Sequence, residues 1–341
     1  MKNHNYWWKM ANGRMLLCLT VLALAGAARG EKYGGEFLNI PVGAKAMAMG
    51  GAFGPLADDL SAIYWNPAGL GRQDQPQAML THTTLFSNLA SHDFLALSWP
   101  MGEKLILGAA WLRLGIDDIP RFSYTVGTPP IGSLGDNQNA FYLSAASRFS
   151  RLILNKPWQI NPGGSLKLIY HQLDDRQATG LGLDVGILLT ADLGQWLARR
   201  TKASPIVGML PAPVRNSALG VISLSLVGQD LGGTNLAWDT PLQHNDVRLA
   251  VYKVGLGYQQ PMPPLRSTLS ISWEGSNEDL QDGRLGSELR YRNLAALRLG
   301  RERSGTTLGG GISLWRVQLD YAYNGHDLGN THRVGATYRL R

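Results

Sequence analysis

The fold class of this chain is decided by the stretch Gly180-Leu181-Gly182-Leu183-Asp184-Val185-Gly186-Ile187-Leu188-Leu189. Its odd positions are all leucine, valine or isoleucine, whereas glycine and aspartate occupy every even position but one. Side chains of a β-strand point alternately to opposite faces, so this period of two predicts a strand with one apolar and one polar face. Asp184 lies on the polar face, which we therefore expect to meet water or other polar groups.

The same alternation recurs along the chain after residue 76, in runs that end at Gly, Pro, Asn or Asp. About fourteen such runs can be distinguished. We expect strands over 77–85, 92–99, 104–116, 139–149, 160–172, 179–190, 217–228, 247–259, 266–274, 284–292, 294–301, 306–314, 317–323 and 331–340. Runs of this length suit tilted, membrane-crossing strands of about 9–11 residues, and an even number suits a closed barrel. The sequence therefore predicts an all-β fold: a transmembrane antiparallel β-barrel over residues 76–341.

A soluble β-sandwich would also show alternation, so the barrel needs further support. The apolar faces carry aromatic residues near strand ends, as expected for the girdles at the two membrane–water interfaces. These aromatic residues are Trp99, Trp111, Tyr170, Tyr258, Trp273, Tyr291, Tyr323 and Tyr338. The opposite faces mix glycine with charge, as at Lys167, Asp184 and Glu274, which suits a hydrated or plugged lumen.

The lengths of the connections agree with a barrel whose first strand runs outward. Connections after odd strands then face the exterior and are expected to be longer. The third, residues 117–138, and the seventh, 229–246, are long, whereas 100–103 is a tight turn after an even strand. Residues 191–216 break this rule, and we interpret them as a periplasmic insertion.

The first thirty residues have the pattern of a signal peptide. Lys2, Lys9 and Arg14 precede an apolar run, 15–24, and small residues follow it. The run is short for a membrane anchor, so export with cleavage is the expected outcome and the outer membrane the expected location. Residues 1–30 carry four basic and no acidic side chains, so removing them lowers the net charge from +7 to +3. That balance gives little support to a nucleic-acid partner.

Residues 31–75 differ from the rest of the chain. They contain the glycine pair Gly50-Gly51, a short helix-like piece at 58–64, and then Trp65-Asn66-Pro67-Ala68. Asp58 or Asp59 can cap the start of that helix, and Pro67 ends it. A segment of this length cannot form a domain of its own. We expect it to pack inside the barrel as a hatch.

This segment resembles the opening of the PorV/PorQ family, which is related to the FadL-type long-chain fatty-acid transporters. The resemblance lies in 37–53, in Asp58-Asp59 and in 64–70, and it returns in 285–291, 297–300, 308–311 and 331–333 near the end of the chain. It implies a fourteen-stranded barrel with an N-terminal hatch. FadL-type members resemble diffusion channels for hydrophobic molecules, whereas PorV-type members serve type IX secretion at the cell surface. The mature chain is short for a FadL protein, which favours the PorV/PorQ branch.

The hatch residues have two interpretations. Asn66, Pro67 and Ala68, with Trp65 beside them, could form a gate that moves, or a tight turn that holds a permanent stopper in place. Gly50 and Gly51 are expected to permit sharp bends of the backbone. Both interpretations stay open on the sequence alone.

Charged residues on the polar faces of the last strands form a second candidate group. We expect cross-strand ion pairs among Glu288, Arg290, Arg298, Asp320 and Arg333, closing the barrel and holding the hatch. The histidines are scattered without metal-ligand spacing, and no nucleophile–base arrangement stands out. We therefore expect neither a metal, a cofactor nor a catalytic site.

The expected function is transport across the outer membrane or secretion at it. The alternatives are a passive channel for hydrophobic solutes such as fatty acids, and a structural barrel without transport. The expected partners are outer-membrane lipids including lipopolysaccharide, and either an exported cargo or a hydrophobic small molecule. Residues 333–340 resemble the terminal signal read by the barrel-assembly machinery, although the chain ends in Arg341 rather than an aromatic residue.

Overall fold

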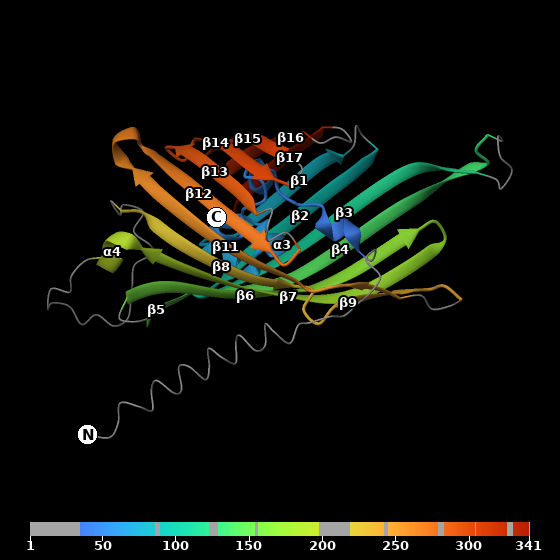
Figure 1. Ribbon diagram of the computed structural model, residues 1–341, viewed down its shortest axis with the longest axis horizontal. Coiled ribbons are helices and arrows are strands. Elements are labelled where there is room, and N and C mark those ends of the chain that lie inside the picture. Colours follow the sequence, from blue (N-terminus) through green and yellow to red (C-terminus); the bar gives the residue numbers. More distant parts are fainter. Residues whose placement is uncertain are drawn as a thin grey trace, which may run out of the picture.

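The strands of the computed structural model form a closed antiparallel ring (Figure 1). The model describes residues 35–85, 89–122, 129–153, 156–197, 219–241, 245–278, 283–303, 305–325 and 330–340. The ring closes where the first strand pairs with the last, with Gln77 opposite Arg339. This confirms the predicted closed barrel of 14 strands. The expected signal peptide, 1–30, lies outside the described residues.

The ring strands follow one another in chain order. They are β1 (Gln77–Leu85), β2 (Ala90–Met101), β3 (Leu105–Arg121), β4 (Gly132–Ser147), β6 (Lys156–Leu173), β7 (Arg176–Asp192), β8 (Val221–Gln229), β11 (Val251–Met262), β12 (Ser267–Ser276), β13 (Arg284–Tyr291), β14 (Ala295–Glu302), β15 (Gly305–Leu314), β16 (Val317–Asn324) and β17 (Thr331–Arg339). β5 (Phe149–Ile153) continues β4 along β6. These fourteen strands form the wall of the barrel. Because their number is even, the start of β1 and the end of β17 lie at the same rim, here called the termini rim. The opposite rim is called the far rim.

Four neighbouring strands are longer than the sequence pattern predicts. β3, β4, β6 and β7 have 16 to 18 residues and project beyond the others at the far rim (Figure 1). The seventh connection also contains a hairpin that the pattern did not predict, β9 (Thr234–Trp238) and β10 (Asn245–Arg248). In β3, β4 and β7 the extra parts at this rim are mostly polar on both faces, for example at Asp136 and Asn137, whereas the extra part of β6, 156–159, lies at the termini rim. Strand pairing continues there, but the apolar alternation that marks a strand in sequence has ended.

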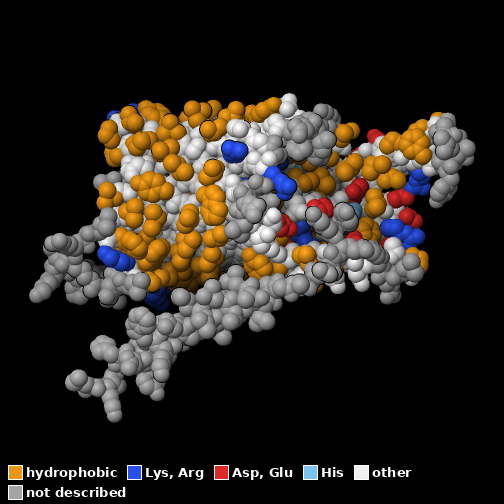
Figure 2. All heavy atoms as spheres, viewed as in Figure 1, with side chains coloured by type: hydrophobic (Ala, Val, Ile, Leu, Met, Phe, Trp, Pro, Cys, Tyr) orange, Lys and Arg blue, Asp and Glu red, His pale blue; other side chains and the backbone are white. Residues whose placement is uncertain are grey.

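The two faces of the wall meet different surroundings. Leu143, Leu166 and Leu181 point outward and are 69%, 62% and 74% exposed, whereas Lys167 and Asp184 point inward and are 3% and 1% exposed. Figure 2 shows apolar side chains covering the wall, while acidic side chains gather toward the far rim. A continuous apolar outer surface of this kind suits hydrocarbon better than water. None of the helices in the described ranges is long and apolar enough to cross a membrane.

Residues 35–75, here called the N-terminal segment, lie inside the ring. Its short helices are η1 (Glu36–Asn39), α2 (Ala44–Ala48), η2 (Gly54–Leu56), α3 (Ala62–Trp65) and η3 (Pro67–Arg72). α2 contacts β14 to β17, η2 contacts β8, β11 and β12, and η3 contacts β3, β4, β6 and β7. Contacts on all sides of the ring place this segment in the lumen. α4 (Leu193–Leu197) and η5 (Pro263–Leu265) lie in connections at the termini rim, and most of the expected insertion, 198–218, lies outside the described residues.

Candidate functional site

The candidate site is the contact between the N-terminal segment and the inner face of the wall. The described segment begins near the far rim, where the backbone oxygen of Gly35 accepts a hydrogen bond from Arg248 Nη1 at 3.2 Å. It ends at the termini rim, where the backbone oxygen of Gly71 accepts from Arg148 Nε at 2.7 Å. The segment therefore runs through the length of the lumen before the chain enters β1.

A pair of wall glycines lets Asn66-Pro67-Ala68 pack against the backbone of the wall; such a point of close approach is here called a seat. Gly163 of β6 lies directly opposite Gly186 of β7. A Cβ atom on Gly163 would lie 2.5 Å from the backbone nitrogen of Ala68, and one on Gly186 would lie 2.1 Å from Asn66 Oδ1. Real Cβ atoms do not approach other atoms so closely, so only glycine fits at either position. The predicted hatch residues thus pack directly on the wall.

A second pair forms the seat for Gly50. Gly286 of β13 lies opposite Gly300 of β14. A Cβ on Gly300 would lie 2.0 Å from the nitrogen of Gly50, and one on Gly286 would lie 2.5 Å from the oxygen of Met49. Gly50 itself has a φ of 64°, a left-handed conformation in which glycine is favoured.

A third seat lies under η2. Gly255 and Gly257 of β11 face Pro55 and Leu56, and Cβ atoms there would approach their side chains to 2.7 and 2.9 Å. Glycine therefore has the same structural effect at all three seats on the inner faces of the strands. It lets the backbone or side chains of the segment approach the wall closely at three points around the ring.

Asn66 also organises the segment internally. It is fully buried, its Oδ1 accepts from the backbone N–H of Ala68 at 3.1 Å, and its Nδ2 donates to the oxygen of Gly54 at 3.3 Å. The first bond caps η3, and the second joins η3 to η2. Trp65 donates from Nε1 to the oxygen of Val42 at 3.0 Å. Gly51 lies against the same indole, because a Cβ there would approach Trp65 Cη2 to 2.9 Å.

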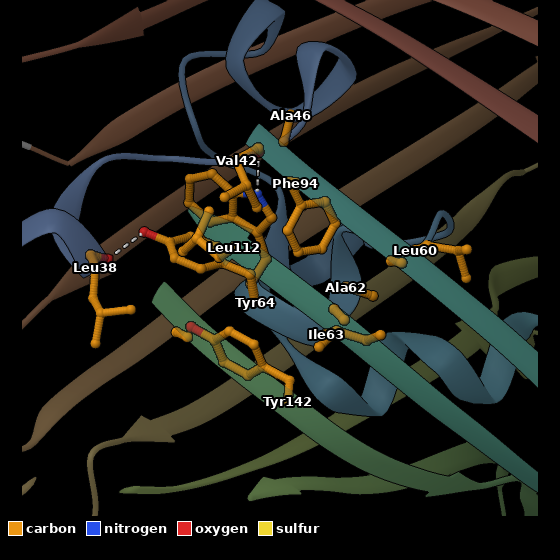
Figure 3. Close-up of a cluster of buried hydrophobic side chains, with 14 of the residues drawn as sticks. Leu38, Val42, Ala46, Leu60, Ala62, Ile63, Tyr64, Phe94, Leu112 and Tyr142 are labelled. Carbon is orange, nitrogen blue, oxygen red and sulfur yellow. Dashed lines mark hydrogen bonds between the residues drawn. The ribbon is translucent and has the colours of Figure 1, made fainter. Parts of the chain in front are cut away.

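An apolar cluster fills the space between the segment and β2 to β4. Ile63 and Tyr64 of the segment pack with Phe94, Leu112 and Tyr142 of the wall (Figure 3). The hydroxyl of Tyr64 donates to the oxygen of Leu38 at 2.8 Å, which satisfies its polar end. Each fully buried side chain of this size stabilises the packed state by about 1.5–3 kcal/mol. The segment therefore packs against the wall as a hydrophobic core does, without a continuous layer of water.

A chain of buried and partly buried charges joins the segment to the last strands. Arg298 Nε lies 2.7 Å from Glu288 Oε2, and Arg298 Nη1 lies 2.7 Å from Asp320 Oδ1. Arg290 Nη2 lies 2.7 Å from Glu288 and 3.6 Å from Asp58 Oδ2 of the segment. Asp58 in turn pairs with Lys45 of α2. The structure thus brings together four of the five predicted charged residues and adds two from the segment.

Arg333 does not join this chain, and the sequence-based grouping is wrong for it. The β16–β17 register places Asp320 opposite Gly335, whereas Arg333 lies opposite Ala322. Arg333 as a whole is 3% exposed, and within the described residues its Nε and Nη1 have no hydrogen-bond partner. Sequence alternation placed Arg333 on the inner face correctly, but it contains no information about the register.

A second charge cluster lies on the opposite side of the lumen. Lys167 Nζ lies 2.9 Å from Asp184 Oδ1 and 2.7 Å from Asp230 Oδ1. Arg248 Nε lies 2.6 Å from Asp230 Oδ2, and Arg248 Nη2 donates to Asn39 Oδ1 of η1 at 2.8 Å. Asp230 and Arg248 were missed in the sequence because they stand in or beside the irregular seventh connection. In the sequence they show only as charged residues at the two ends of the predicted connection 229–246, and that position does not indicate that they meet.

The segment also contains two adjacent aspartates with opposite pKa shifts. Burial raises the pKa of Asp58, but the nearby charges of Lys45 and Arg290 lower it more, so its pKa lies below the usual range. Burial raises the pKa of Asp59 to about 6, only partly offset by Lys45, and the charge of Asp58 adds to the increase. Asp59 Oδ1 accepts from the backbone N–H and the hydroxyl of Ser61, at 2.9 and 2.6 Å.

We expect Asp59→Asn to remove a pH dependence of stability. The folded pKa of about 6 lies above the ordinary value of 3.8, so the folded protein binds the extra proton. Stability is then fully present below pH 3.8 and falls as the pH rises through about 6, by at most about 3 kcal/mol. Asparagine keeps the acceptor oxygen for Ser61 and carries no charge. Thermal unfolding in detergent at pH 4, 5, 6 and 7 should show a decline for the wild type that the variant lacks; parallel curves would contradict the assignment.

Two cavities adjoin these elements. One, of about 250 Å³, lies above the segment toward the far rim and is lined by Leu38, Tyr64, Arg248, Lys253 and Arg284 among others. The other, of about 550 Å³, lies on the outward face of the wall at β8, β11 and β12 and is lined mainly by apolar and aromatic side chains. The lumen cavity is therefore charged, and the apolar one faces away from the lumen.

In the cavity above the segment, two cations lie on aromatic rings. Lys253 Nζ lies 5.4 Å from the ring centre of Trp65 and 5.8 Å from that of Tyr64. Arg284 Cζ lies 5.9 Å from the Trp65 ring. Such cation–π contacts contribute about 0.5–2 kcal/mol each. They stabilise the position of the predicted hatch residue Trp65 from the side of the far rim. Within the described residues, no group of three or more His, Cys, Asp or Glu side chains could hold a metal ion.

The sequence matches no family model and no curated protein. Among solved structures, the chain is similar to a deletion mutant of the monoaromatic hydrocarbon channel TodX, with 12% identity, a TM-score of 0.49, and coverage of 88% of this chain and 99% of that one. A Pseudomonas aeruginosa FadL homologue gives 10% identity, a TM-score of 0.46, and coverage of 88% and 98%. The porin KdgM gives 10% identity, a TM-score of 0.33, and coverage of 78% of this chain and 99% of that one. Likeness at these values does not indicate what this chain binds or moves.

Proposed function

We propose that this chain is an outer-membrane barrel of the PorV/PorQ type, held closed by its N-terminal segment and serving secretion at the outer membrane without a catalytic role. One observation carries the proposal. The segment is fixed in the lumen by wall glycines at three points, by the partly buried Arg290–Asp58 ion pair on one side, and by hydrogen bonds from Arg248 to Asn39 and Gly35 on the opposite side. Moving it as a gate would break these contacts together and leave buried donors and acceptors of the wall and the segment without partners, each at a cost of about 1–3 kcal/mol.

The outward surface supports the proposed location. Large apolar side chains cover the wall, and the polar side chains of the strands point inward. Exposed to water, a surface of this size would associate or aggregate, whereas lipid covers it at no such cost.

The far rim supports a binding role at the cell surface. β3, β4, β6 and β7 rise above the rest of the wall, and their extensions are polar, with Asp136 Oδ1 2.8 Å from His171 Nε2. The ring of His171 packs edge-on against Trp238 of β9 at 4.8 Å between centroids. An ordered wall of this kind on one side of the rim could contact an exported protein as it reaches the surface.

Deletion of the gene in the source bacterium would test the secretion role. We expect exported surface proteins to accumulate in the periplasm, while growth on long-chain fatty acids stays unchanged. Complementation with the intact chain is the matched control. Normal surface proteins together with lost fatty-acid uptake would replace the proposal with the channel alternative. If neither changes, the structural-barrel alternative stands.

A passive channel for hydrophobic solutes is the second candidate, and the apolar pocket of about 550 Å³ favours it. A solute leaving sideways through the wall would need an apolar site on the outward face, where Leu256, Ile271 and Trp273 line this pocket. The candidate predicts that a labelled fatty acid binds the purified barrel and that Leu256→Asp abolishes that binding. Leu289→Asp, on the same outer face but outside the pocket, is the control.

A further inference from the structure

The place where the first and last strands close the barrel contains a group of buried polar side chains. Arg333 of β17 and His92 of β2 each lie directly opposite Thr83 of β1, one on either side of it. Thr81 lies on the same inner face of β1, two residues closer to the termini rim. These side chains are between 1% and 3% exposed. The three adjacent strands therefore present one guanidinium, one imidazole and two hydroxyls to the same part of the lumen.

Several of these groups have no partner in the part of the chain that the structure describes. Arg333 Nε and Nη1, His92 Nε2 and Thr81 Oγ1 are all buried without a hydrogen bond. Within the described residues the guanidinium forms no ion pair at 4 Å or less; the nearby carboxylate of Glu302 acts on its charge from further away and accepts a hydrogen bond from Asn324 instead. All other arginines with exposed fractions below 10% in the lumen, Arg248 and Arg298, are paired with carboxylates at 2.6 to 2.7 Å. Arg333 is the exception among them.

Such an arrangement is costly unless something else occupies it. A buried charge without a counter-charge loses several kcal/mol of hydration, and each buried N–H without an acceptor costs about 1–3 kcal/mol. Water could accept the hydrogen bonds, but it would not balance the charge. Arginine can only donate, threonine can donate, and the imidazole donates from Nε2 in one tautomer. A group of donors around a guanidinium that has no direct ion-pair partner is suited to an anion.

We propose that Arg333, His92 and the hydroxyls of Thr81 and Thr83 bind one chloride-sized anion inside the barrel. A monatomic anion is the smallest anion that can accept from several donors at once, and these side chains are almost fully covered. Because the ligands come from β17, β1 and β2, the ion joins the two ends of the wall. It stabilises the closure of the ring, independently of whether the barrel serves secretion or diffusion.

Exchange of chloride for bromide in crystals of the wild-type protein tests the site without any substitution. We expect an anomalous bromide peak within hydrogen-bond distance of Arg333 Nη1 and His92 Nε2. No peak at this position in saturating bromide would overturn the proposal. A peak that persists in Arg333→Met would mean an adventitious ion only and would overturn it as well.

Thermal unfolding gives a second test. At constant ionic strength, the wild type should melt several degrees higher in sodium chloride than in sodium gluconate, because a ligand that binds the folded state raises its stability. Arg333→Met should lose this difference. Arg113→Met is the control, because it removes one positive charge from the outward face of β3, where Arg113 donates to Asn137 Oδ1 at 2.8 Å, and it should keep the difference. Equal melting temperatures of the wild type in the two salts would contradict the proposal.

Discussion

Replacing Gly163 by alanine is expected to lift Asn66-Pro67-Ala68 off the wall and open an ion path through the barrel. The added Cβ would lie 2.5 Å from the nitrogen of Ala68 and 2.5 Å from the carbonyl carbon of Pro67. Both are backbone atoms and cannot rotate away, so either β6 or the segment must shift. Overpacking of a closely fitted interior typically costs about 1–3 kcal/mol. We expect a lower melting temperature and a higher single-channel conductance in planar bilayers.

The neighbouring residue provides the control. Gly164 points outward, where a Cβ would lie 3.4 Å from the oxygen of Asp184, an ordinary contact. Gly164→Ala changes the same strand by the same group and should leave conductance and melting temperature unchanged. If Gly163→Ala behaves like Gly164→Ala, then the segment does not rest on this seat.

Replacing Arg298 by methionine is expected to have the second large effect. Arg298 is the central cation between Glu288 and Asp320, and its side chain is almost fully buried. Methionine would leave the carboxylates of Glu288 and Asp320 close together in the lumen, with Arg290 and Lys45 as the remaining cations of the chain. Separation of a buried ion pair costs about 3–5 kcal/mol. The last strands and the Asp58–Arg290 contact should loosen, which raises ion conductance and lowers the melting temperature.

Arg301→Met is the matched control for this prediction. Arg301 lies on the same strand, but its side chain points outward and is exposed. The same substitution there removes a positive charge without unpairing a carboxylate in the lumen. Normal folding of Arg298→Met with unchanged conductance would show that the charge chain does not hold the lumen closed.

The two variants also separate the two interpretations of Asn66-Pro67-Ala68. A permanent stopper gives no conductance until a seat or an ion pair is destroyed. A gate gives intermittent opening in the wild type, and Gly163→Ala only makes the openings more frequent. Recordings of the wild type for long periods therefore decide between them.

Much of the wall could be predicted because each strand repeats one local rule. Gly180–Leu189 alternates along its length, and all fourteen ring strands were recognised from the same pattern. The rule failed where β3, β4 and β7 extend into the far rim, because both faces of those extensions are mostly polar, and it missed the first residues of β6 at the termini rim. It also missed β9 and β10, which are short and lie in a connection.

The site could be predicted only in part. Alternation placed Glu288, Arg290, Arg298, Asp320 and Arg333 on the inner face, yet it could not show that Arg333 lies opposite Ala322 rather than an acidic residue. Asp230 and Arg248 were not recognised at all. Ion pairs between strands depend on the register, and register is set by pairing between segments far apart in the sequence.

By itself, the sequence determined which residues form strands and which face of each strand is apolar, because both follow from the period of the local pattern. It also marked 31–75 as a segment unlike the wall. Only the tertiary structure decided that Gly163 and Gly186, or Gly286 and Gly300, meet across neighbouring strands and form seats for Ala68 and Gly50. The physical reason is that a glycine pattern in one strand says nothing about what approaches it. Closure of the ring around the segment brings those backbones together.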